Sequence, residues 1–553
     1  MAAKPKKTTQ KKTGRQDGLR ERQVNQSLRS ISAAFFIMIT AIFPLYITGT
    51  RYVGFVQAKA NFFYIITSIA AVLTLFALLF LPRPFRLRDY FTKDEPGRPP
   101  SVAEWGLLAF IWLTFLSAVF SRWQHIVWSG YQGRHEGFWT ILCYGVTFFI
   151  IARFFQPKRL HFLLFAGGAV LVSLYAILQF CGWDIFEFFP YTMARFLDAD
   201  GNPTRGPLSI THRTTLGNTN IVAAYCSLVI PLFAALFAEE RTKYGWFYLA
   251  ASVMSFALLL ITRGDGGKVG VLGGMVLLIP FWISNRERLG KIFIALSGWS
   301  VVYMAYNLYL DALKRNPELH LIPFRDRRFL QGFTPVNPVL LILLILIPLT
   351  AGLFLTFLLK KWPEPRRMKI AGFAFLTLAA VGGVLFIEII GARIVGQPRN
   401  IFWQAREILH GRMQDSFGTN RGWVWIRGLS VIPEHPILGT GPDTFYHALG
   451  DTLQHEAFRR YNIVFDKAHN MYLQIAVCMG IPALLAFLTF WGGLFAGFIK
   501  KALSRPFLLA CGAGALSYLI QAFFLVDMPV DKPLLWAVFG VMAGEIWRER
   551  IGV

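Results

Sequence analysis

The sequence is poor in charged residues and in cysteine. Only 16% of its 553 residues are charged while 55% are hydrophobic, a balance that excludes a soluble globular protein of this size. The five cysteines lie in or at the ends of apolar runs and show no CxxC spacing, so neither a disulfide framework nor a zinc site is expected. No cleavable signal pattern, internal repeat or appended soluble domain is visible. Lipid is therefore the expected solvent.

Long apolar runs dominate what is present. A bilayer core about 30 Å thick takes roughly 20 residues of helix, because its backbone groups find no water there. Runs of this kind cover residues 30–48, 61–81, 103–121, 138–155, 160–181, 219–238, 245–262, 268–284, 290–308, 336–360, 368–390, 471–499, 505–525 and 532–547. Within the run from Met471, Gly480 and Pro482 predict a short helix that breaks before a full crossing begins. We expect an all-α integral membrane protein with about 12–14 transmembrane helices.

Positive charge follows the predicted helices rather than forming a patch for nucleic acid. The formal net charge is +25, and nine Lys or Arg lie within residues 1–29. From a cytoplasmic N-terminus, every second loop also carries basic residues, as the positive-inside rule requires of cytoplasmic loops. Both termini are therefore predicted to be cytoplasmic, with anionic membrane lipids rather than nucleic acid as partners.

This topology divides the chain into four segments. They are a basic cytoplasmic tail (1–29), eleven transmembrane helices (30–390), a large extracytoplasmic loop (391–470) and the C-terminal transmembrane helices (471–553). The large loop holds nine Lys or Arg and seven Asp or Glu. Its mixed charge and its length make it the place where catalytic chemistry is expected.

The large loop offers three kinds of functional group. Arg421 and Arg427 supply planar guanidinium groups suited to phosphate. Gly439 and Gly441 would let backbone N–H groups approach a ligand. His469 lies where the chain re-enters the membrane, and a neutral imidazole can accept a proton near neutral pH. Together these groups favour an anion-binding site with a base at its edge.

Four motifs in this order resemble the O-antigen ligase family. GNTNIVAAY begins at Gly217, Thr262 to Gly264 follow as TRG, Arg421 precedes two tryptophans and the turn HPILGTGP, and HNMYLQ begins at His469. The resemblance spans about residues 210–490. In two places the chain departs from the pattern: Thr219 stands where the family usually has Pro, and Asp265 and Lys268 follow Arg263.

The resemblance implies a glycosyltransferase of the bacterial cytoplasmic membrane. It would take a glycan from a polyprenyl diphosphate carrier on the outer face and join it to a hydroxyl of a glycan, lipid or protein acceptor. His469 would be the base, and arginines would stabilise the leaving diphosphate, so the reaction would be a single inverting displacement without cofactor or metal. The residues assigned to this site are His469 and Arg421 as catalytic, with Arg263, Arg213, Arg427, Gly439, Gly441, Asn470 and Glu388 as substrate-binding.

Each of these residues also has a simpler structural interpretation. His469 could merely bond backbone at a helix start, and Arg421 could be a solvated loop charge. Arg263 could extend from its helix end to lipid headgroups, and Glu388 could pair with an arginine or orient His469. Asp198 and Asp200 form a DxD pattern, but DADGNP is a strong turn signature and the turn interpretation is preferred. Residues 48–59, predicted as the first outer loop, contain no acidic residue, which argues against a metal-dependent membrane transferase.

Three alternatives to a ligase are open. A polysaccharide polymerase of the O-antigen type, or a protein O-oligosaccharyltransferase, would use the same loop architecture. A flippase or other transporter of lipid-linked glycans can also have about fourteen spans, but such folds usually show related halves and polar residues at mid-membrane. This chain collects its polar groups at the predicted outer surface, which favours chemistry over passage.

Overall fold

The computed structural model of the chain describes residues 7–48, 52–80, 101–181, 183, 194–197, 203–206, 214–316, 333–393, 401–525 and 528–547. Helices make up almost all of this part of the chain, and the one sheet in it is an antiparallel pair of short strands, β1 (Ala194–Leu197) and β2 (Pro203–Gly206). These strands flank Asp198 and Asp200, which lie outside the described residues.

The all-α membrane fold is confirmed. Ten described helices are long and apolar enough to cross a membrane. They are α2 (Tyr52–Leu79), α3 (Val102–Phe120), α6 (Arg159–Phe180), α7 (Thr219–Glu239), α8 (Gly245–Thr262), α11 (Arg286–Arg315), α13 (Pro338–Leu353), α14 (Pro365–Arg393), α19 (Ile481–Lys501) and α20 (Pro506–Gln521). The other four predicted runs are also helical, on the end of α1 (Lys7–Ile37) with η1 (Met38–Ile42), on α5 (Phe138–Phe154), on α9 (Asp265–Leu277) with α10 (Ile279–Trp282), and on α21 (Lys532–Trp547).

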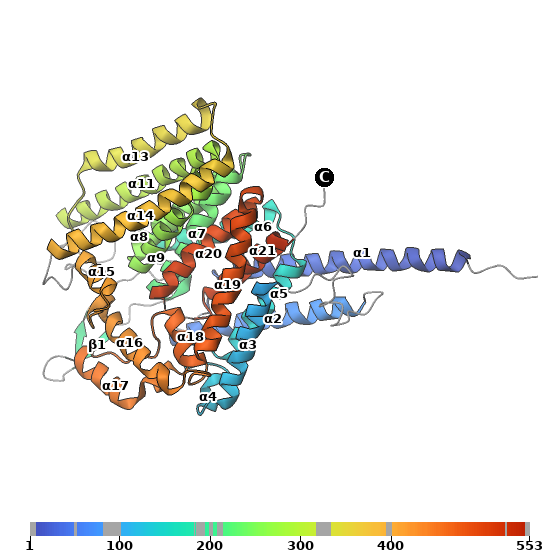
Figure 1. Cartoon of the computed structure of the whole chain (residues 1–553), viewed down its shortest axis with the longest axis horizontal. Helices are drawn as coiled ribbons and strands as arrows, with labels where there is room; N and C mark the ends of the chain where they lie inside the picture. The colour runs from blue at the N-terminus through green and yellow to red at the C-terminus, as the bar shows by residue number, and fades with distance from the viewer. Residues whose placement is uncertain are drawn as a thin grey trace, which may run out of the picture.

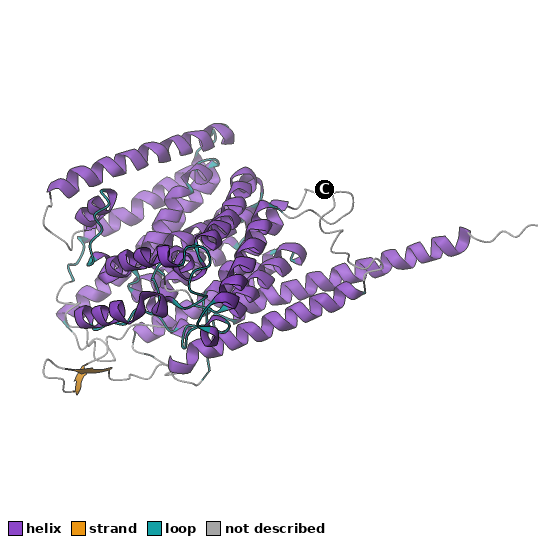
Figure 2. Cartoon of the chain, turned by 60° about the horizontal axis from the view of Figure 1, so that its bottom comes forward, coloured by secondary structure: helices purple, strands orange, loops and turns teal. Residues whose placement is uncertain are grey.

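The first two helices differ from the prediction. Residues 7–29, expected as a tail, continue as helix into the first apolar run, and α1 and α2 project side by side from the body of the molecule (Figures 1 and 2). Of the predicted loop 48–59, residues 52–59 belong to α2. Buried Lys59 explains this extension, because its ammonium donates to the carbonyls of Phe43 (2.9 Å) and Pro44 (3.1 Å) where the first helix ends.

The core forms around α7. Every residue in the most apolar window of α7 is buried, whereas only 6% of the corresponding window of α14 is. Figure 1 shows α7 among α8, α9 and α20, with α11, α13 and α14 forming an outer layer. Asn218 caps α7 by accepting from the N–H of Asn220. The exposed leucines and phenylalanines of the outer layer suit a lipid solvent.

The segment between α14 and α19 contains shorter helices. They are α15 (Ile401–Leu409), α16 (Phe417–Val431), η6 (Ile432–Glu434), α17 (Phe445–Tyr461) and α18 (Met471–Met479). Gly480, at φ +90°, separates α18 from α19, so the predicted break in the run from Met471 is confirmed. Figure 1 shows α16, α17 and α18 together at one end of the bundle.

Candidate active site

His469 is held in a strained backbone position. Its φ is +52°, a left-handed conformation that is uncommon for residues other than glycine. The next residue, Asn470, caps α18, since its side-chain oxygen accepts from the N–H groups of Tyr472 (3.0 Å) and Leu473 (3.1 Å). The cap fixes the start of α18, and the strained backbone directs the chain out of the helix at His469.

Side chains from three helices bind the backbone of the loop before His469. On α17, Gln454 donates to the carbonyl of Phe465 (2.7 Å) and accepts from its N–H (3.1 Å). From α16, Trp425 Nε1 donates to the carbonyl of Ala468 (3.0 Å), and from α18 Gln474 accepts from the N–H of Ala468 (2.8 Å). The loop is thus specified by buried polar groups and has little freedom to relax.

Arg421 on α16 faces the same region. One of its terminal nitrogens donates to the carbonyl of Gly418 (3.0 Å), whereas its buried Nε has no hydrogen-bond partner among the described residues. Burial lowers the pKa of its guanidinium, and the negative charge of Asp265 raises it in part. A buried guanidinium with an unused N–H is suited to receive an anion.

The imidazole of His469 is neutral at physiological pH. Burial and the positive charge of Arg421 lower its pKa to about 4. Its Nδ1 is buried and has no partner among the described residues. Charges on Asp466, Arg134 and Lys467 also act on it. Arg421 Nε and His469 Nδ1 are therefore two buried nitrogens, one on a cation and one on a neutral imidazole, without a hydrogen-bond partner in the described chain.

The TRG motif ends next to a residue, Asp265, whose charge acts on Arg421. Arg263 ends α8 in a left-handed conformation at φ 55°, and α9 begins two residues later at Asp265. Asp265, which pairs with Lys268 (2.9 Å), is the acidic group whose charge acts on Arg421. The two residues with no place in the family pattern thus have a local explanation, since they pair with each other at the start of α9.

Two predicted site residues are engaged in ion pairs elsewhere. Arg427 pairs with Asp415 (2.5 Å), approaches Glu456 (3.6 Å) and lies over the ring of Trp423. Glu388 accepts from Arg406 (3.0 Å) and contacts His410 (2.9 Å). Of the two partners considered for Glu388, the structure provides an arginine. Arg213 lies outside the described residues.

Gly439 and Gly441 serve a different purpose from the one expected. Their N–H groups donate to the carbonyls of His435 (3.0 Å) and Cys478 (2.7 Å). A Cβ on Gly439 would lie 2.4 Å from the Cys478 backbone, and one on Gly441 would lie 2.5 Å from Ser121 Oγ. The glycines therefore let the turn pack against the end of α18, and these N–H groups are already bonded within the protein.

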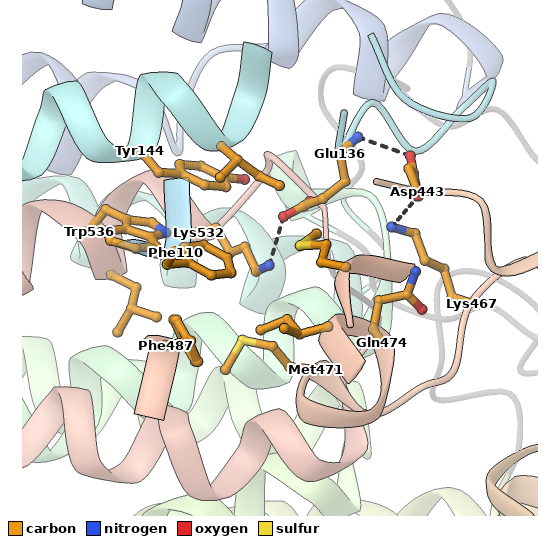
Figure 3. Close-up of a pocket in the computed structure, with 14 residues that line it drawn as sticks. Phe110, Glu136, Tyr144, Asp443, Lys467, Met471, Gln474, Phe487, Lys532 and Trp536 are labelled. Atoms are coloured by element: carbon orange, nitrogen blue, oxygen red, sulfur yellow. Dashed lines mark hydrogen bonds and ion pairs between the residues drawn. The ribbon is translucent and has the colours of Figure 1, made fainter. Parts of the chain in front are cut away.

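Two buried ion pairs were not predicted from the sequence. Lys467 pairs with Asp443 (2.5 Å) and Lys532 pairs with Glu136 (2.6 Å). Both pairs line a cavity of about 30 Å³ between α3, α18, α19 and α21 (Figure 3), room for one or two water molecules. The sequence does show ionisable residues beside apolar runs, and such residues are costly in a membrane protein and need partners. It does not show which residues pair, because the partners are far apart in the chain.

The fold and the polar groups around His469 define the class of protein. It is a multi-pass membrane protein in which Arg421 and His469, in the segment of short helices between α14 and α19, each have a buried nitrogen without a hydrogen-bond partner in the described chain. Residues 340–488 match the family model described as O-antigen ligase. The predicted resemblance to the O-antigen ligase family is thereby confirmed, and the matched segment contains Arg421, the glycine turn and His469.

This match supports, in general terms, a glycosyltransferase activity of the glycan ligase or polymerase type. The donor of such an enzyme is in general a lipid-linked glycan, and the acceptor is a glycan or lipid. A comparison with curated proteins finds no match.

Proposed function

We propose that the protein transfers a glycan from a polyprenyl diphosphate carrier to an acceptor hydroxyl, on the extracytoplasmic face of the bacterial cytoplasmic membrane. The observation that carries this proposal concerns His469 and Arg421 together. Each has a buried nitrogen with no hydrogen-bond partner in the described chain, and the positive charge of Arg421 acts on the imidazole of His469. Residues 391–470 are accordingly assigned as the catalytic loop.

The chemistry assigns one role to each group. The acceptor oxygen attacks the anomeric carbon, the bond from that carbon to the diphosphate oxygen breaks, and the diphosphate leaves with the electron pair. The hydroxyl proton passes to the imidazole of His469. Arg421, with Arg263 beside the start of α9, stabilises the charge on the leaving oxygen. A single displacement of this kind inverts the anomeric configuration, and the arginines supply the charge a metal would supply elsewhere.

Donor binding would also prepare the base. The positive charge of Arg421 lowers the pKa of His469 in the free protein. A diphosphate bound to Arg421 brings negative charge, which raises that pKa again. His469 would thus become a stronger base only when the donor is in place.

The acceptor is assigned as a lipid core, with a growing glycan or a protein hydroxyl as the alternatives. Analysis of surface glycans after deletion of the gene separates these outcomes. A ligase leaves uncapped acceptor with long lipid-linked donor, whereas loss of a polymerase leaves single repeat units. Normal glycans on both the acceptor and the carrier would contradict the proposal.

The transporter alternative is tested in the same strain. His469→Ala expressed in place of the natural protein abolishes glycan joining while the lipid-linked donor accumulates, if the protein is a transferase. Export that continues with normal joining would indicate passage rather than chemistry.

A further inference from the structure

Two ion pairs fasten the residues immediately before His469. Arg134 binds Asp466 through two nitrogens, Nε to Oδ2 at 2.6 Å and a terminal nitrogen to Oδ1 at 3.0 Å. Lys467 pairs with Asp443 at 2.5 Å, and both of these side chains are buried. The residues at positions 466 and 467 are therefore tied to two different parts of the chain.

The two tethers meet in one structural unit. Arg134 lies in the connection between α4 (Gln124–Val127) and α5, and Asp443 lies just before α17. Asp443 also accepts from the N–H groups of Tyr131 (2.7 Å) and Glu136 (3.1 Å). Figure 3 shows Asp443 between Glu136 and Lys467, with a dashed line to each. The loop of His469 is consequently held against a segment more than 300 residues earlier in the chain.

His469 needs such support because its backbone is in the left-handed region, at φ +52°. A residue keeps that conformation only where its surroundings determine it. The ion pairs add to the bonds that Gln454, Trp425 and Gln474 make to this loop. Their loss would leave the strained backbone of His469 with fewer restraints, so that the imidazole would be held less firmly toward Arg421.

The charged groups around His469 act in opposite directions. Arg421 on α16, Arg134 before α5 and Lys467 in the same loop lower the pKa of the imidazole, and Asp466 raises it. The ring of Phe465 adds an uncharged edge contact. Arg134 and Asp466 therefore act on the pKa of the imidazole in opposite directions.

We propose that Arg134 and Asp466 are positioning residues for His469, which fix its loop in the strained conformation. Lys467 and Asp443 are the buried second tether of the same loop. This inference rests on the proposed role of His469 as the base. Neither Arg134 nor Asp466 needs to touch the substrate.

The test compares Arg134→Gln and Asp466→Asn in a transfer assay with purified protein, donor saturating, between about pH 4 and 9. Both variants lower the rate at the plateau, by roughly tenfold to a hundredfold, since the base is displaced. The acid limb of the kcat profile moves to higher pH in Arg134→Gln, because a positive charge is lost beside His469. In Asp466→Asn it moves to lower pH, because a negative charge is lost.

A conservative variant separates the effect of the charge of Arg134 from the effect of its hydrogen-bond geometry. Arg134→Lys keeps the charge but loses the two-nitrogen contact, so its acid limb stays near that of the natural protein while its rate falls. Arg159→Gln is the matched control, since Arg159 makes a similar two-nitrogen pair with Glu240 (2.9 and 3.2 Å) away from this site. It should change neither the rate nor the profile.

Three results would overturn the inference or its basis. If Arg134→Gln and Asp466→Asn both behave like Arg159→Gln, the pair does not position His469. If both lose activity with no shift, or a shift in the same direction, the pair is only structural. If His469→Gln retains transfer, the proposed function itself is wrong, which is a distinct outcome.

Discussion

His469 lies beside a cation, and this neighbour controls when its imidazole can accept a proton. Burial alone would lower the pKa of the imidazole, and the charge of Arg421 lowers it further. In return, the neutral imidazole adds no repulsion to an already buried guanidinium. The two side chains are compatible with each other because only one of them is charged, and both have capacity left for a ligand.

Arg421→Ala removes the cation assigned to the diphosphate. Hydrogen bonds to charged groups contribute about 1.5–3 kcal/mol, so we expect kcat/KM for the lipid-linked donor to fall roughly tenfold to a hundredfold. The measurement is a steady-state titration of donor. Arg459→Ala, an exposed arginine on α17 of the same segment, is the control and should leave the constant unchanged. Equal constants for both variants would remove Arg421 from the site.

The pH dependence follows from the same pair. Transfer requires the unprotonated imidazole, and its pKa in the free protein is lowered to about 4. The kcat/KM profile, which reports the free enzyme, should therefore lose activity only as pH falls through about 4, and not near the ordinary histidine value of about 6.5. The acid limb of kcat lies higher, because bound diphosphate raises this pKa. An acid limb of kcat/KM near 6.5 would contradict the assignment.

At the scale of elements, the turn that contains Gly439 and Gly441 and the end of α18 form one hydrogen-bonded unit. The N–H groups of Thr440 and Gly441 donate to the carbonyls of Val477 (3.2 Å) and Cys478 (2.7 Å), and Ile481 N–H donates to Pro436 (2.9 Å). The first two bonds satisfy carbonyls at the end of α18, where a helix leaves its last carbonyls without intrahelical partners. The turn therefore ends α18 after nine residues and helps set the depth of His469 at its other end.

Gly439→Ala should disrupt the packing of this turn against the end of α18. The added Cβ would lie 2.4 Å from backbone atoms of Cys478, and the φ of +64° is unfavourable for alanine. We expect a clear fall in the thermal midpoint of the purified protein together with loss of transfer.

Gly411→Ala is the matched control for Gly439→Ala. Its φ of +70° imposes the same backbone strain, but its Cβ would meet no atom within 4 Å. Strain alone costs about 1–2 kcal/mol, so a similar loss of stability in both variants would show that the packing of the turn against α18 is unimportant.

Elements could be predicted from the sequence where the signal is local. Apolar runs report helices directly, because a helix satisfies all of its backbone groups within one segment, and Gly480 marks the end of α18 through its own turn chemistry. Asn470, predicted to bind substrate, instead caps α18. The extension of α2 down to Tyr52 was missed because it depends on Lys59 binding carbonyls of the preceding helix.

The partners of charged side chains could not be predicted in this way. Arg427 and Glu388 carry the right chemistry for a site but lie beside Asp415 and Arg406 in the fold. Asp443 directly follows the HPILGTGP motif and Lys467 lies two residues before HNMYLQ, yet nothing in the sequence pairs them. The type of a residue indicates which chemistry its side chain can perform. Its ion-pair partner depends on contacts between distant parts of the chain.

On the scale of the whole molecule, a buried ion pair joins the two ends of the fold. Lys532, at the start of α21, and Glu136, at the start of α5, pair at 2.6 Å across 396 positions of sequence. Breaking a buried pair on one side leaves a charge without its counterion, which is strongly destabilising. The pair therefore fixes how the C-terminal helices pack against the N-terminal ones.

A double-mutant cycle tests this link. Lys532→Met should lower the free energy of unfolding by about 3–5 kcal/mol, and Glu136→Gln combined with it should recover much of the loss. Chemical unfolding in detergent provides the measurement. Losses that simply add in the double variant would show that the two side chains do not act as a pair.

The central claim is that His469, presented by this fold beside Arg421, is the base for glycan transfer from a lipid-linked donor. The most direct measurement is transfer by purified protein in lipid vesicles, supplied with polyprenyl diphosphate-linked glycan and an acceptor, for the natural protein and for His469→Gln. The account predicts product from the natural protein and none from the variant, with donor left intact and the variant still folded. Transfer by His469→Gln at the natural rate would contradict it.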